Sequence, residues 1–286
     1  MNKYTALIMD LKKSRRYSSK NRNEIQDYIY HVVQVLNIAF RRSLEKDVFF
    51  SAGDELQGLF SSVEASYLYF RLFSMLVAPV EIRAGIGVGE WDVIIKYAGT
   101  TAQDGSAYHN ARRAINATEE SLGYSVLLFS GEKNDIIINS LFNSTALIIN
   151  KQSEYQNQIM LLSELLYPIN AYDIININVL KDIVRLILLR SETVQFDVFK
   201  IYKKHREPLI FKLSHLNFES RPIDAIENTD TFFVTEGKVR GLPMQLSEIL
   251  GVTRQSADKT IKAANIYEAR NLAVVTLKYL KHLEVV

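Results

Sequence analysis

Three carboxylates lie at the ends of apolar runs or between two of them. Asp10 follows the apolar run 4–9, and Asp54 and Glu55 form a two-residue connection between apolar runs within 48–60. Such runs predict strands, and a two-residue connection between them predicts a tight hairpin with an acidic tip. Carboxylates at strand ends hold Mg²⁺ or Mn²⁺ in many phosphoryl-transfer enzymes. We therefore expect Asp10, Asp54 and Glu55 to converge on a divalent metal.

A second informative pattern lies near the carboxy-terminal end. Leu246 and Leu250 fall on one helix face, and Gly251 suits the left-handed conformation that ends a helix. Thr253 suits the cap of a following helix, so the spacing predicts a helix-turn-helix at about residues 244–264. The outward positions of its second helix carry amide, hydroxyl and cationic groups suited to base edges and phosphates. These DNA-binding candidates are Arg254, Gln255, Ser256, Lys259 and Lys262.

Charge supports this prediction, and one residue opposes it. Residues 238–286 carry eight Lys and Arg against four Asp and Glu, a net charge of +4 within a chain of net charge +2. Asp258 favours the alternative, a helical pair used for protein contact, because a carboxylate facing phosphates repels them.

Periodicity predicts the elements that position the acids. The expected order is a strand at 4–9, a helix at 25–40, the hairpin at 48–60, a helix at 62–75, a strand at 81–89, a helix within 104–120 and a strand at 124–129. This order predicts an α+β fold with helices packed on one face of a sheet, over a domain of residues 1–150. Residues 151–286 carry mostly helical patterns.

Composition excludes several classes of site and protein. The chain has no cysteine, which excludes disulfides and thiolate metal ligands, and its five histidines show no ligand-like spacing. Any metal is therefore expected to have oxygen ligands. No apolar run approaches the length of a membrane span, and the first run is too short for a signal peptide. We expect a cytoplasmic protein without membrane contact.

Four segments resemble the SatD family of bacterial proteins: residues 8–15, 53–58, 82–87 and 105–112. More distantly, they are similar to class III nucleotide cyclases and to the palm of GGDEF-type cyclases. The resemblance implies a ferredoxin-like sheet, with Asp10 and Asp54 as metal ligands and Glu55 as a helper. It also implies phosphate contacts from the loop after the first acid, where Lys12, Ser14 and Arg15 stand.

In these enzymes an arginine on a later helix stabilises developing charge, a role that would fall to Arg112. Tyr108 then stands where those enzymes carry a catalytic asparagine, and Asn110, two positions away, is the candidate for that catalytic role. Phe50 stands where adenylate cyclases carry a base-reading lysine. These departures favour a site that binds a nucleotide over one that turns it over.

The sequence thus indicates a cytoplasmic DNA-binding regulator whose cyclase-like domain binds a nucleotide through Mg²⁺ or Mn²⁺, with a homodimer as one option. The alternative is an active nucleotidyl cyclase or nucleotidyltransferase with a helical interaction module. A third interpretation is a structural protein in which both the nucleotide site and the helix-turn-helix are degenerate.

Overall fold

The elements form an α+β fold, as predicted. The computed structural model describes residues 3–12, 19–121, 123–170, 173–192, 220–225 and 232–283. The strands are β1 (Tyr4–Leu11), β2 (Leu44–Ala52), β3 (Glu55–Phe60), β4 (Ile82–Gly89), β5 (Val126–Phe129), β6 (Ile169–Asn170) and β7 (Ile223–Asp224). The α-helices are α1 (Ser19–Ala39), α2 (Val63–Val77), α3 (Ser106–Glu120), α4 (Asp135–Asn150), α5 (Glu154–Leu166), α6 (Leu180–Glu192), α8 (Leu242–Leu250), α9 (Arg254–Ala263) and α10 (Ile266–His282). Two short 3₁₀ turns are η2 (Thr100–Ala102) and η3 (Ile177–Val179).

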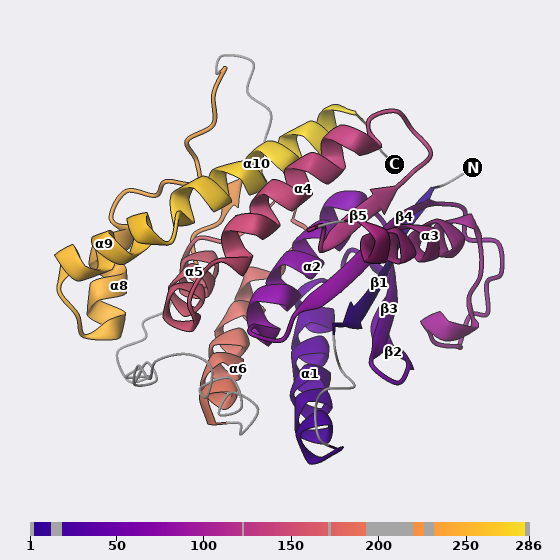
Figure 1. Ribbon diagram of the computed structural model, residues 1–286, viewed down its shortest axis with the longest axis horizontal. Coiled ribbons are helices and arrows are strands. Elements are labelled where there is room, and N and C mark those ends of the chain that lie inside the picture. Colours follow the sequence, from indigo (N-terminus) through magenta and orange to yellow (C-terminus); the bar gives the residue numbers. More distant parts are fainter. Residues whose placement is uncertain are drawn as a thin grey trace.

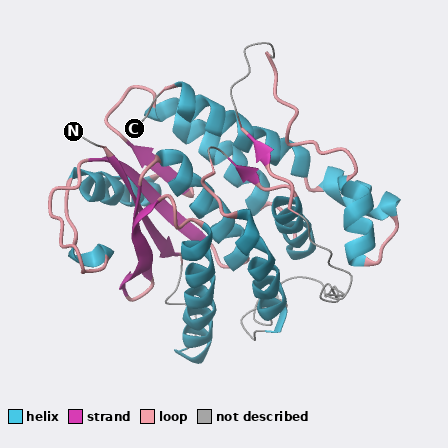
Figure 2. Cartoon of the chain, turned by 180° about the vertical axis from the view of Figure 1, so that it is seen from behind, coloured by secondary structure: helices cyan, strands magenta, loops and turns pink. Residues whose placement is uncertain are grey.

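The main sheet is mixed, with strand order β2-β3-β1-β4-β5. All neighbouring pairs are antiparallel except β4 and β5, which are parallel and joined through α3. Each outer strand has backbone groups bonded to an asparagine side chain: Asn37 of α1 with Val48, and Asn139 of α4 with Leu128. These side chains occupy groups that an unpaired edge would offer to another strand. Figure 2 shows the sheet toward one end of the molecule.

Helices cover both faces of this sheet, which corrects the prediction of helices on one face. Leu7 and Met9 of β1 belong to the large core formed with α1 and α2, whereas Ala6 and Ile8 pack with Ala107 of α3. The alternation of side chains along β1 therefore supplies two apolar faces. The periodicity of single elements does not specify which face each helix covers, and the prediction failed at that step.

The packing of α3 depends on the glycines of β4. A Cβ atom at Gly85 would lie 2.2 Å from the carbonyl oxygen of Ala111, and one at Gly87 would lie 2.0 Å from its nitrogen. Backbone approaches backbone here, so any side chain at these positions would displace the helix. The close approach fixes α3 above the end of β1 and β4.

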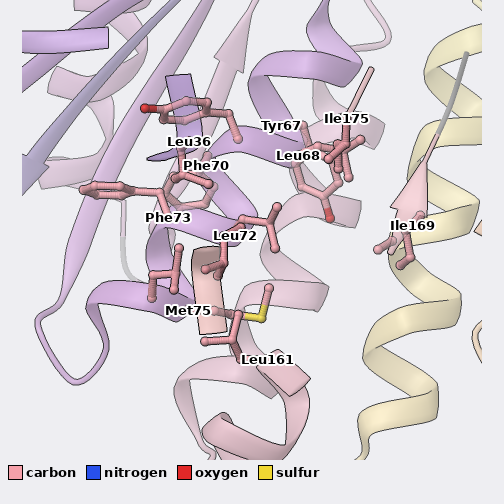
Figure 3. Packing of buried hydrophobic residues seen from close by; sticks show 14 of the residues in the cluster. Leu36, Tyr67, Leu68, Phe70, Leu72, Phe73, Met75, Leu161, Ile169 and Ile175 are labelled. Atoms are coloured by element: carbon pink, nitrogen blue, oxygen red, sulfur yellow. The ribbon is translucent and has the colours of Figure 1, made fainter. Parts of the chain in front are cut away.

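Helix α2 lies at the centre of the large core. Figure 3 shows its aromatic and aliphatic side chains, including Phe70, Phe73 and Met75, packed with residues of other elements such as Leu161 of α5. The same cluster of buried residues extends from β1 to Leu280 of α10. The two halves of the chain therefore share one continuous core, and the predicted boundary near residue 150 stays a prediction.

Two local differences from the predicted elements concern the hairpin and α4. The two-residue connection is Gly53–Asp54, and Glu55 is the first residue of β3, not part of the turn. Gly53 has φ +63, which glycine adopts at little cost, and this shifts the turn by one position. No element is predicted from the sequence at 135–150, where α4 forms. The helical patterns predicted beyond residue 150 are confirmed for α5 and α6.

Candidate functional site

Acidic and basic residues meet in a row at one end of the sheet. Asp10 on β1 lies directly opposite Glu55 on β3 and opposite Arg83 on β4. Residues directly opposite each other in antiparallel strands point to the same face. Because Ile8 lies two residues before Asp10 and packs under α3, this row lies on the α3 face of the sheet.

Two arginines hold the carboxylates of the row. Arg83 donates from Nε and Nη2 to Oδ2 of Asp10, at 2.8 and 2.5 Å, and it also contacts Glu119 of α3. Arg112 of α3 forms a bidentate pair with Glu55, with Nη1–Oε2 and Nη2–Oε1 distances of 2.5 and 2.7 Å. Bidentate geometry fixes both partners. Glu55 is therefore fully engaged, whereas Oδ1 of Asp10 has no donor among the described residues.

The pKa values of Asp10 and Glu55 are shifted in opposite directions. Burial raises the pKa of Asp10 above its ordinary value, the Arg83 guanidinium opposes that rise, and the negative charges of Asp54 and Glu55 add to it. Burial also acts to raise the pKa of Glu55, but hydrogen bonds, first that from Arg112, outweigh it and the pKa lies below its ordinary value. The rise in the pKa of Asp10 comes chiefly from burial, and the neighbouring acids add a smaller part.

Asp54 is the acid with a carboxylate left open. It lies in the hairpin turn, partly buried, and it forms no hydrogen bond or ion pair with the described residues. Gln26 of α1 donates to the carbonyl of Gly53 at 3.1 Å and ties the turn to the helix. No three acidic or histidine side chains of the described ranges gather closely enough to enclose a metal by themselves. A cation here would rely on Asp54, Asp10 and oxygens from a ligand.

The predicted phosphate contacts are described only in part. Lys12 follows β1, and its backbone N–H donates to the carbonyl of Glu81 at 2.8 Å. This hydrogen bond extends the pairing of β1 with the start of β4. The backbone of Lys12 therefore lies close to the row of charged residues. Ser14 and Arg15 lie outside the described residues.

The two residues proposed for catalysis lie on α3 but serve different ends. Arg112 reaches the row, whereas the Asn110 side chain donates to the carbonyl of Val88 at 2.8 Å and ties α3 to β4. Tyr108 lies one turn before Arg112, and its hydroxyl is 3.3 Å from Oγ1 of Thr100. Burial raises the pKa of Tyr108 to about 12, so the phenol stays neutral. The structure thus brings Arg112 to the acids and leaves Asn110 in a packing role.

Arg83 was not among the predicted site residues, and the structure places it within the row. The available signal was the alternation along β4: Arg83 shares a face with Gly85 and Gly87, which face α3. A charged residue that continues a glycine stripe beneath a helix must lie at the margin of that helix. Its second partner, Glu119 near the end of α3, had no comparable signal.

The helical pair near the carboxy-terminal end forms with the predicted caps. Gly251 ends α8 in the left-handed conformation, with φ 63 and ψ 30, and Oγ1 of Thr253 accepts from the N–H of Ser256 at 3.1 Å. Leu246, Ala257 and Ile261 are buried between the helices. Both helices lie at the end of the molecule away from the sheet (Figure 1).

The outward face of α9 carries the five predicted residues, all exposed: Arg254, Gln255, Ser256, Lys259 and Lys262. Asp258 lies one turn before Lys262, and their carboxylate and ammonium are 2.7 Å apart. The pair neutralises one charge of the helix and leaves Arg254 and Lys259 as cations with no ion pair among the described residues.

The SatD family model matches residues 4–181, more than half of the chain. The chain belongs to the SatD family. No curated protein matches it. The SatD match covers the complete acidic row and Arg112, while α8 and α9 lie beyond it. Among the helices of the described ranges, none has the length and apolarity to cross a membrane.

Proposed function

We propose that this SatD family protein is a cytoplasmic DNA-binding regulator whose sheet end binds a nucleotide through Mg²⁺ or Mn²⁺. The observation that carries the proposal furthest is the α8–α9 pair. Its turn has the left-handed glycine and the capping threonine of a helix-turn-helix, and its second helix presents exposed amide, hydroxyl and cationic groups. Amide and cationic groups are those that a recognition helix presents to base edges and phosphates.

Base edges and phosphates would be contacted by different residues of α9. Arg254 and Gln255 lie in its first turn, the part of a recognition helix that contacts bases in the major groove. Their guanidinium and amide groups can each make two hydrogen bonds to a purine edge. Lys259 and Lys262 lie farther along and are suited to phosphate contacts, with Lys262 partly neutralised by Asp258.

The sheet end supports the nucleotide part of the proposal. The first six elements run strand, helix, strand, strand, helix, strand with the order β2-β3-β1-β4, which is the arrangement of a ferredoxin-like sheet. On it, Asp54 and Oδ1 of Asp10 are the oxygens open to a cation. A bound Mg²⁺ would supply charge to bridge these carboxylates and phosphate oxygens. Lys12, at the end of β1, is the nearest described lysine in sequence to the acids.

The arginines of the row also suit a phosphate chain. Arg83 and Arg112 neutralise Asp10 and Glu55 through contacts that a planar guanidinium makes equally well to phosphate. Arg112 keeps nearly half of its side chain exposed, at 46%. A phosphate that binds on the solvent side of the row could therefore contact the Arg112 guanidinium.

The alternative function is an active nucleotidyl cyclase or nucleotidyltransferase. The approach of Arg112 to the acids favours it, because such an enzyme needs a cation beside its metal ligands. Tyr108 and Asn110 oppose it, since one is hydrogen-bonded to a threonine and the other to a backbone carbonyl. Incubation with each nucleoside triphosphate and Mn²⁺ separates the two: we expect only trace product. Sustained turnover that is lost in Asp54→Ala would establish the enzyme.

The DNA proposal is tested by competition gel shifts with the full-length protein and genomic fragments from around its own gene. We expect Arg254→Ala and Gln255→Ala to lose roughly 1–3 kcal/mol of discrimination against competitor DNA. Lys96→Ala, in the loop beside the sheet, is the control and should bind as the wild type does. If the wild type binds no fragment at low salt, with or without nucleotide, then α8–α9 is a protein-contact module.

A further inference from the structure

Helix α4 has an outward face without any charged side chain. Its inward face is formed by Ile138, Phe142 and Thr145, and Phe142 stacks on Tyr67 with ring centroids 4.4 Å apart. No Asp, Glu, Lys, Arg or His occurs from residue 136 to residue 150. Surface helices of globular proteins usually present charged residues on the side opposite the core. The outer side of α4 therefore has the character of a contact surface.

This outward face carries apolar side chains at both ends and small serine side chains in the middle. Ile136 and Ile137 are 76% and 48% exposed, and Leu147, almost three turns later, is 42% exposed. Between them lie the exposed Ser140 and Ser144, each bonded to the carbonyl four residues before it within the helix. Their hydroxyls are therefore satisfied, and burying them would not leave an unpaired donor.

We propose that α4 is the contact through which two copies of this chain associate, with the two helices antiparallel about a two-fold axis at the level of Phe142. The pattern is self-complementary in that arrangement: position 137 meets position 147 of the partner copy, and position 140 meets position 144. Each isoleucine end then covers a leucine end, and the serines allow close approach at the axis. A two-fold contact needs one surface to complement itself, which this face does.

The lack of charge on the α4 face and the area it could bury both agree with a second copy of the chain as its partner. Like charges would meet across the axis of a two-fold contact, and this face has none to repel. A helix of 16 residues is about 24 Å long, and α10 lies alongside it (Figure 1) with partly exposed Leu272 and Val275. Two such helices side by side offer roughly 400–500 Å² per copy, near the lower limit for a specific interface. The dimer is therefore expected to be weak and dependent on concentration.

The contact would also set the arrangement of the two α9 helices. The end of α4 is tied to the end of α9, because Nε2 of Gln152 donates to the carbonyl of Ala264 at 3.0 Å. Antiparallel α4 helices then place the two copies of α9 at opposite ends of the dimer. This consequence rests on the proposed DNA function, whereas the contact itself does not.

The test uses sedimentation velocity on the full-length protein and two double variants, Ser140→Lys with Ser144→Lys and Ser140→Glu with Ser144→Glu. We expect the wild type to change from monomer to dimer as its concentration rises through the micromolar range. Each double variant should remain monomeric at the same concentrations, and an equimolar mixture of the two should regain the dimer. Circular dichroism checks that both variants remain folded, as expected for exposed positions.

Three outcomes would overturn the proposal. A wild type that is monomeric at every concentration would exclude the dimer, and variants that dimerise like the wild type would place the contact elsewhere. Monomeric variants that stay monomeric when mixed would exclude the antiparallel pairing of positions 140 and 144. None of these readouts involves nucleotide or DNA, so they are independent of the proposed function.

Discussion

Asp10 and Glu55 lie side by side on neighbouring strands, yet their protonation equilibria are displaced in opposite directions. The difference follows from their partners: Glu55 receives a bidentate arginine, whereas Asp10 has bonds to one oxygen only. The sequence predicted that Asp10 ends a strand beside an acidic hairpin, because apolar runs mark strand ends. It did not predict the arginine pairs, which depend on the registers of β1, β3 and β4 and on the position of α3.

At the scale of single residues, Asp54 provides the direct test of the metal site. With a nucleoside triphosphate and Mn²⁺ at about 100 times Kd, binding should raise the free energy of unfolding by about 2.7 kcal/mol. Asp54→Asn should abolish this gain without unfolding the protein, since Asp54 has no ion pair with the described residues. Thermal shift assays with and without metal measure the effect. Equal shifts in the wild type and the variant would exclude Asp54 as a ligand.

The opposite pKa displacements predict opposite effects of two neutral substitutions. The lowered pKa of Glu55 means that its charged form stabilises the fold above its ordinary pKa, a contribution that is lost as pH falls through the lowered value. The raised pKa of Asp10 means that its charged form costs stability once pH exceeds the ordinary value. At pH 7, Glu55→Gln should therefore destabilise by up to about 1 kcal/mol, and Asp10→Asn should not.

Urea denaturation between pH 3 and pH 7 measures both differences. The Glu55 difference should be lost as pH falls through the lowered pKa of Glu55, and the Asp10 difference should be gone once pH lies below the ordinary pKa of Asp10. Two variants that lose equal stability at pH 7 would show that the arginine pairs do not distinguish the two acids.

At the scale of elements, the glycines of β4 fix the position of α3. Gly87→Ala would place a Cβ 2.0 Å from the backbone nitrogen of Ala111, and we expect a loss of about 1–3 kcal/mol from overpacking. Gly99→Ala is the matched control, because nothing lies within 4 Å of its Cβ position and its φ is −65. Equilibrium denaturation compares them. A Gly87→Ala protein as stable as the Gly99→Ala protein would contradict the close packing.

Helix α4 could not be predicted from the periodicity of its sequence. Its isoleucines occur on the inward and the outward face alike, so no polar stripe marks a helix period. By contrast, α8 and α9 were predicted with their caps, because Gly251 and Thr253 act locally and need no tertiary context. Signals that lie within a few residues could be read from the sequence. The assignment of α3 to the opposite face of the sheet could not.

At the scale of the whole molecule, a buried charge cluster connects the two halves of the chain. Glu164 of α5 contacts Arg71 of α2 at 2.5 Å and Arg270 of α10 at 3.0 Å, and all three side chains are at least 97% buried. Nη2 of Arg270 also donates to the carbonyl of Tyr167 at 2.5 Å. The cluster joins α5 to α2 in the first half of the chain and to α10 in the second.

Removing the shared acid should therefore be costly. Glu164→Gln leaves two buried arginines without their counter-charge, and we expect the free energy of unfolding to fall by about 3–5 kcal/mol. Glu248→Gln, at an exposed position of α8, should change it by less than about 0.5 kcal/mol. Urea denaturation measures both. A loss below about 1 kcal/mol in Glu164→Gln would show that the cluster does not hold the halves together.

The proposed function implies that a ligand at the sheet end changes DNA binding at α9. Fluorescence anisotropy with a DNA fragment that the full-length protein binds tests it most directly, with and without saturating nucleoside triphosphate and Mn²⁺. We predict that at least one triphosphate changes the DNA Kd of the wild type about 5-fold or more, the usual lower range for coupled sites, and leaves that of Asp54→Asn unchanged. A wild type that binds both nucleotide and DNA, with a DNA Kd unaffected by every triphosphate, would contradict the account.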